Sequence, residues 1–118
     1  MTNGVFDHSK PYVLKESVQY AEGSVVSKII TRNIAGNITL FAFDENQNLS
    51  EHTAPFDAVV QIIEGKAKII INKQTYALSE NDMIIMPANV PHAVEANGKF
   101  KMLLTMLKSW LFYDLGGI

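Results

Sequence analysis

The sequence contains no cysteine, so no disulfide stabilises the fold, and any metal site must use histidine, carboxylate or amide ligands. It also lacks any apolar run near the roughly 20 residues that a membrane-spanning helix requires. Its first residues have neither the basic start nor the apolar core of a secretory signal. These absences predict a cytoplasmic protein with no membrane partner.

Charge is sparse, and neither sign dominates. The formal net charge is -2, and the 10 lysine and arginine residues are scattered along the chain. Because a nucleic-acid-binding domain normally carries a basic stripe, the composition predicts no nucleic-acid partner. The chain has 118 residues, of which 47% are hydrophobic, and this is enough to close one core. We therefore predict a single domain over residues 1–118.

Short β-like runs separated by polar turns fill most of the chain, and no helical period persists. The runs that predict strands cover residues 23–31, 38–43, 58–63, 66–71, 74–78, 83–86, 92–96 and 100–107. Hairpin turns are expected at Glu64-Gly65-Lys66 and at Asn72-Lys73, because glycine and asparagine tolerate a positive φ. This pattern predicts an all-β sandwich or barrel, with a barrel core over about residues 24–107.

Residues 108–118 form an apolar C-terminal tail that holds the only tryptophan. Such a tail is expected to pack on the barrel or on a partner subunit rather than to stay in water. Val59-Val60 and Ile62-Ile63 also make one strand apolar on both faces, and a strand of this kind needs a cover on its outer side. Together these features favour a homodimer.

The chain has three histidines. His52 precedes Gly65 in one spaced motif, and His92 follows Asn81 and Pro87 in another. These motifs resemble those of the cupin superfamily, and the resemblance covers about residues 37–107. Counted back from Gly65, the histidine and glutamate ligand positions of the first cupin motif fall on His52, Ala54 and Ala58. The second motif is matched by the spacing from Asn81 through Pro87 to His92. The resemblance implies a jelly-roll barrel, also called a double-stranded β-helix.

The departures from the cupin motifs are of two kinds. Asn46, Asn81 and Asn89 stand where the family has glycine, and asparagine adopts the left-handed conformation more readily than other side chains. We therefore expect the turns to be kept. Ala54 and Ala58 stand where the family has metal ligands, and alanine coordinates nothing. The resemblance thus implies a kept barrel with a depleted metal site of two histidines.

Strand alternation predicts which side chains face the barrel interior. Val60 and Ile62 are expected inside, and Gln61 and Glu95 outside. Lys101 and Thr105 are expected in solvent, which sends Met102, Leu104 and Met106 inward. The methionines at 83, 86, 102 and 106 are interpreted as core filler. The predicted pocket is lined by Ala54, Ala58, Val60, Val94, Met102 and Leu104.

The leading interpretation of this pattern is a small-molecule-binding cupin whose catalytic status is open. Its candidate residues are His52 and His92, which would hold a small ligand by hydrogen bonds or act as general acid and base. One alternative is a metal-dependent oxygenase or isomerase with these two histidines as ligands of a weakly held divalent transition metal; Glu51, Asp57 and His8 are the only evident supplements. Another is a non-catalytic sensor or interaction module. In the simplest case both histidines only satisfy buried backbone groups.

Overall fold

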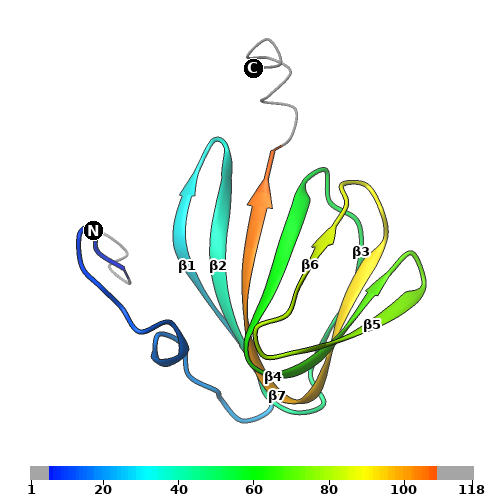
Figure 1. Ribbon diagram of the computed structural model, residues 1–118, viewed down its shortest axis with the longest axis horizontal. Coiled ribbons are helices and arrows are strands. Elements are labelled where there is room, and N and C mark those ends of the chain that lie inside the picture. The colour runs from blue at the N-terminus through cyan, green and yellow to red at the C-terminus, as the bar shows by residue number, and fades with distance from the viewer. Residues whose placement is uncertain (1–5, 109–118) are drawn as a thin grey trace.

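The computed structural model describes residues 6–108, and Figure 1 shows their arrangement as a bent antiparallel sheet. A short 3-10 helix, η1 (Leu14–Glu16), lies in the N-terminal segment. The seven strands are β1 (Val25–Asn33), β2 (Gly36–Phe43), β3 (Asn48–His52), β4 (Asp57–Ile71), β5 (Gln74–Ser79), β6 (Met83–Met86) and β7 (His92–Leu107). Residues 109–118, most of the predicted apolar tail, lie outside the described residues.

Two long strands, β4 and β7, hold the barrel together. The strand order is β1-β2-β7-β4-β5, with β3 added to β7 and β6 added to β4. The first part of β4 pairs with β6 and its last part with β5, whereas β7 starts beside β3 and ends beside β2. Because both long strands bend midway, the two ends of the sheet face each other (Figure 1). The expected all-β jelly-roll fold is confirmed.

The predicted hairpin at Gly65 is wrong. Gly65 has φ of 80°, but β4 continues through it, and the register with β7 shifts on both sides of this position. Gly98, with φ of 84°, lies in the facing part of β7. A positive φ permits a bulge as well as a turn, so the residue type alone did not separate the two. The predicted 58–63 and 66–71 strands are therefore one strand.

The other turn predictions hold. Asn72 and Lys73 have φ of 50° and 68°, as a two-residue hairpin with both central residues left-handed requires. Asn46, Asn81 and Asn89 have φ of 66°, 77° and 64°. Each asparagine thus takes the conformation for which the cupin motif uses glycine, and the turns that position the loops are kept.

The barrel interior is the main core, and alternation predicted it well. Val60 and Ile62 of β4 are buried while Gln61 between them is exposed. At one end of the barrel the buried rings of Phe43 and Phe100 stack with centroids 4.4 Å apart. Met83 is a correction: it is 59% exposed on β6, because the alternation that buries Met86 turns Met83 outward.

The N-terminal segment covers part of the outer face of the sheet. Buried Val18 packs against outward-facing Leu40 and Ala42 of β2. The prediction that Lys101 lies in solvent is therefore wrong: it faces outward but is 6% exposed. Its Nζ donates to the backbone oxygen of Lys15 at 2.6 Å. Periodicity assigned the correct face, and the covering segment decided the burial.

A polar contact fixes the same segment to the barrel. The Tyr20 hydroxyl donates to Oε2 of Glu64 at 2.6 Å, and Nζ of Lys101 lies 3.9 Å from that oxygen. Burial, followed by the hydrogen bond to the Glu64 carboxylate, raises the pKa of the Tyr20 hydroxyl. The neutral, donating form of Tyr20 is thus the one that this contact stabilises.

Strand β4, which is apolar on both faces, is covered on its outer face in part by the chain itself. Ile63 of β4 packs in the same outer cluster as Val18. Further along the outer face, Met83 and Ile85 of β6 are 59% and 53% exposed, so this part of the sheet has no cover among residues 6–108. The homodimer stays a prediction. Within the same range, no helix has the length and apolarity needed to cross a membrane.

Candidate functional site

The two histidines of the cupin-like motifs meet across a strand pair. His52 ends β3, His92 begins β7, and the two residues are directly opposite each other in the antiparallel register. His92 is 5% exposed and His52 is exposed, so one ring lies inside the barrel and the other lies at its mouth. His8, by contrast, is exposed in the N-terminal segment, which runs outside the barrel (Figure 1).

Backbone contacts between two loops set the position of these rings. The amide of Asn89, in the loop before β7, donates to the carbonyl oxygen of Ala54 at 2.7 Å. The amide of Ala88 donates to Oδ1 of Asp57 at 2.9 Å. The loop that carries His52 into β4 is therefore tied to the loop that carries His92. Asp57, one of the predicted supplementary metal ligands, is one of the two acceptors that connect these loops.

The imidazole rings are in contact. Nε2 of His52 lies 3.1 Å from Nε2 of His92, and the ring centroids are 4.3 Å apart at an interplanar angle of 68°. Nδ1 of His52 lies 2.8 Å from the carbonyl oxygen of Ser50. Nδ1 of His92 lies 3.1 Å from the carbonyl oxygen of Val90. Both rings are thus fixed by the backbone on one side and face each other on the other side.

These partners constrain where the ring hydrogens are. A carbonyl oxygen only accepts, so each Nδ1 that bonds to one carries its hydrogen. In the neutral ring, Nε2 then holds a lone pair, and the two lone pairs would face each other at 3.1 Å. A hydrogen or a cation between the two Nε2 atoms, or a ligand group that donates to them, removes this repulsion. The histidine pair is therefore suited to bind a proton, a cation or a ligand group that donates a hydrogen bond.

The ring pair borders a small apolar cavity of about 50 Å³. It is lined by Leu49, His52, Ala54, Ala58, Met86, His92, Val94, Met102, Leu104 and Met106. Of the predicted pocket residues, Val60 is the one that does not line it; Val60 is packed in the core instead. Leu49 and Met86 were not predicted, although alternation along residues 83–86 would have turned Met86 toward the interior.

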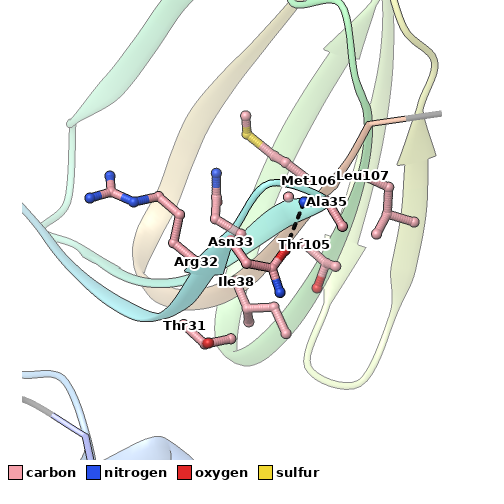
Figure 2. A pocket seen from close by; sticks show the side chains of 10 residues that line it. Thr31, Arg32, Asn33, Ala35, Ile38, Thr105, Met106 and Leu107 are labelled. Atoms are coloured by element: carbon pink, nitrogen blue, oxygen red, sulfur yellow. Dashed lines mark hydrogen bonds between the residues drawn. The ribbon is translucent and has the colours of Figure 1, made fainter. Parts of the chain in front are cut away.

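A larger hollow of about 190 Å³ lies at the end of the β1–β2 hairpin and shares Met106 with this cavity. Figure 2 shows its lining side chains, with Arg32 extending at its margin and the amide of Ala35 donating to Oδ1 of Asn33 at 2.7 Å. Arg32 is the single ionisable side chain among the described residues that line this hollow. We assign the candidate site to the smaller cavity because two imidazoles are directed to one point there.

The donor set does not fit the metal site that the cupin motifs usually carry. Structural zinc takes four protein ligands, and catalytic zinc takes three. Ala54 and Ala58 contribute no donor, and Asp57 is hydrogen-bonded to Ala88. Among residues 6–108, no group of three or more histidine, cysteine, aspartate or glutamate side chains is placed to hold a metal ion.

The comparisons with known proteins agree with this fold. The chain matches the sequence profile of the Cupin domain family over residues 39–107, and it belongs to that family. No curated protein matches it. A conserved protein of unknown function from Streptococcus pyogenes is similar in structure, with 35% identity, a TM-score of 0.82, and coverage of 86% of this chain and 90% of that one.

Two further solved structures are similar. A cupin superfamily protein from Desulfitobacterium hafniense has 28% identity and a TM-score of 0.82, covering 87% of this chain and 94% of that one. A cupin 2 conserved barrel domain protein from Leptotrichia buccalis has 35% identity and a TM-score of 0.80, covering 82% of this chain and 47% of that one. The names of these three relatives state no substrate.

Proposed function

We propose that this cupin binds a small molecule inside its barrel, with His52 and His92 as the polar anchor. The observation that carries the proposal is the pair of Nε2 atoms, 3.1 Å apart, at the wall of an otherwise apolar cavity. Ligand sites commonly combine an apolar lining with a few placed polar groups. Two rings held by backbone carbonyls are preorganised for such a role, because neither ring has to be ordered on binding.

The lone-pair geometry indicates which ligand groups suit the anchor. A phenol or alcohol hydroxyl can donate to one Nε2, and a carboxylic acid can transfer its proton to the pair and remain beside it as an anion. A cavity of about 50 Å³ is far below the roughly 300–1,000 Å³ of drug-sized pockets, so the ligand is small or inserts only its tip. The flexible side chains of Met86, Met102 and Met106 can adjust to its shape.

The same pair is suited to general acid–base chemistry. One ring can accept a proton while the other donates, as an isomerase or lyase step without metal requires. His92 is buried and His52 is exposed, so a proton accepted inside the barrel has a route to solvent through the pair. Binding without turnover would use the same contacts, and the proposal covers both cases.

The methionine methyl groups provide the test. We would label the ε-methyl carbons with ¹³C and titrate the protein with small phenols, carboxylic acids and carbonyl compounds, following each signal by NMR. Ligands in the barrel are expected to shift the signals of Met86, Met102 and Met106. Met83, 59% exposed on the outside of β6, is the internal control and should not move.

A His52→Ala, His92→Ala double variant completes this test. It should remain folded, and it should bind the positive compounds at least about tenfold more weakly, because the hydrogen bonds to the ligand are lost. If no compound in the set shifts the three interior methionines, or if the double variant binds as well as the wild type, the proposed function is wrong.

The alternative metal-dependent function has its own measurement. With two imidazoles and no third histidine or carboxylate placed beside them among residues 6–108, we expect gently purified, untagged protein to hold well under one transition metal per chain by elemental analysis. The double variant is the control for metal bound elsewhere. Close to one metal per chain in the wild type, lost in the variant, would contradict this prediction and favour an oxygenase or isomerase.

A further inference from the structure

We propose that Arg32 and Lys108 form a cationic rim beside the cavity and bind the carboxylate of an elongated ligand whose other end reaches the histidine pair. This inference rests on the proposed binding function and specifies the class of ligand. We call Arg32, Asn37, Phe56 and Lys108 the rim. The ligand class is a small carboxylic acid with a second polar group at the far end of an apolar chain.

The sheet register connects the rim to the cavity. Arg32 of β1 is opposite Asn37 of β2, and Asn37 is opposite Met106 of β7. Met106 is in turn opposite Ala58 of β4. Directly opposed residues lie on the same face of a sheet. Since Ala58 and Met106 line the cavity, the side chains of Asn37 and Arg32 continue the same inner row toward the edge strand β1.

A hollow of about 120 Å³ follows this row outside the cavity. Its lining consists of Arg32, Asn33, Gly36, Asn37, Phe56, Met106 and Lys108. Met106 lines both this hollow and the histidine cavity, so the two spaces meet at this residue. Nζ of Lys108 lies 5.8 Å from the ring centroid of Phe56, which holds that cation over the hollow.

The rim is positive in a protein whose net charge is negative. Arg32 is the only arginine of the chain, and no carboxylate from the described part of the chain lines the hollow. Within residues 6–108, the ion pairs involve neither Arg32 nor Lys108. Asp57, the carboxylate that follows Phe56, accepts a hydrogen bond from Ala88 on the β6 side of β4. With respect to residues 6–108, the two rim cations are thus available to an anionic ligand.

The guanidinium of Arg32 and the side-chain amide of Asn37 can both donate hydrogen bonds to a carboxylate. A guanidinium presents paired N–H groups that match the two oxygens of a carboxylate. The row from Ala58 to Arg32 crosses three strand spacings, about 14 Å at about 4.8 Å each, and the arginine side chain covers part of this length. A six-carbon chain fills the remainder over Met106. Because Ala58 and both histidines line the same cavity, an acid of this length would place its carboxylate at Arg32 and its far end near an imidazole.

The probes are 6-hydroxyhexanoate and 6-hydroxyhexanamide. They share the same chain and hydroxyl group, but the end that would bind the rim is an anionic carboxylate in the first and a neutral amide in the second. Titrations at constant ionic strength would follow the ε-methyl signal of Met106 and the cavity methyl signals of Met86 and Met102. We expect the acid to bind about tenfold more tightly than the amide. Arg32→Gln should weaken the acid by about tenfold and leave the amide unchanged, and Lys108→Gln should have a smaller effect of the same kind.

Lys66→Gln is the matched control, because Lys66 is an exposed cation that lines neither space. It should bind both probes as the wild type does. Equal affinity for acid and amide, or an acid affinity unchanged in Arg32→Gln, overturns the rim proposal. If the acid depends on His52 and His92 but not on Arg32, its carboxylate binds the histidines. The rim proposal then fails while the proposed function stands.

Discussion

Replacing Gly65 with alanine is expected to lower the free energy of unfolding by about 3–5 kcal/mol, through left-handed strain together with a steric clash. Gly65 has φ of 80°, a conformation that costs about 1–2 kcal/mol for an alanine. A Cβ at this position would also overlap the carbonyl oxygen of Lys99 on β7 and come within 3.0 Å of the Cβ of Phe100. Both neighbours belong to a paired strand, so neither can yield cheaply.

Gly98→Ala is the matched control, because Gly98 has φ of 84° and, among the described residues, nothing lies within 4 Å of the place that an alanine Cβ would take. We expect it to cost about 1–2 kcal/mol, from backbone strain alone. Urea unfolding followed by far-UV circular dichroism measures both variants. Equal losses would show that the close approach of β4 and β7 at Gly65 contributes nothing beyond its φ.

Phe100→Ala is the second change with a large expected effect, a loss of about 3–5 kcal/mol in the free energy of unfolding. Phe100 is fully buried, lies opposite both Phe43 and Gly65 in the register, and stacks on Phe43 at 4.4 Å between centroids. Removing the ring opens a void where two bent strands converge, and the neighbouring backbone is too constrained to fill it. The same unfolding experiment measures this loss.

Tyr76→Ala provides the comparison for an aromatic residue on a strand with a partly open surface. Tyr76 lies on β5 and is 37% exposed, so its removal should cost about 1 kcal/mol or less. Similar losses for Phe100→Ala and Tyr76→Ala would mean that the Phe43–Phe100 stack is not a principal source of stability. Phe100→Leu should fall between the two variants, because it keeps part of the buried apolar volume.

Much of the fold could be predicted from the local pattern of the sequence. Alternation predicted Val60 and Ile62 inside and Gln61 outside, because a strand turns successive side chains to opposite faces. The left-handed asparagines were also predicted, since few other residues adopt that conformation readily. Alternation does not predict which other segment of the chain packs over a given face of the sheet. Lys101 was assigned to the correct side and still misjudged, because Val18 and its neighbours pack over that side.

The candidate site could be predicted from the sequence only in part. Motif spacing singled out His52 and His92, and the structure brings them to 3.1 Å between Nε2 atoms. The carbonyl oxygens that hold both Nδ1 atoms, and the lone-pair conflict that follows, depend on loop geometry that no spacing rule describes. The rim was not predicted at all, because Arg32 and Lys108 are separated by most of the chain and meet only through the register of β1, β2 and β7.

The sequence by itself determined the β alternation, the left-handed turns and the two histidines, because these are properties of single residues and of short spacings. The tertiary structure alone decided that β4 continues through Gly65, that Lys101 is buried, and that Arg32 and Lys108 line one hollow. Each of these depends on which distant segment lies opposite a residue. Strand pairing and covering segments fix that relation only when the whole barrel closes.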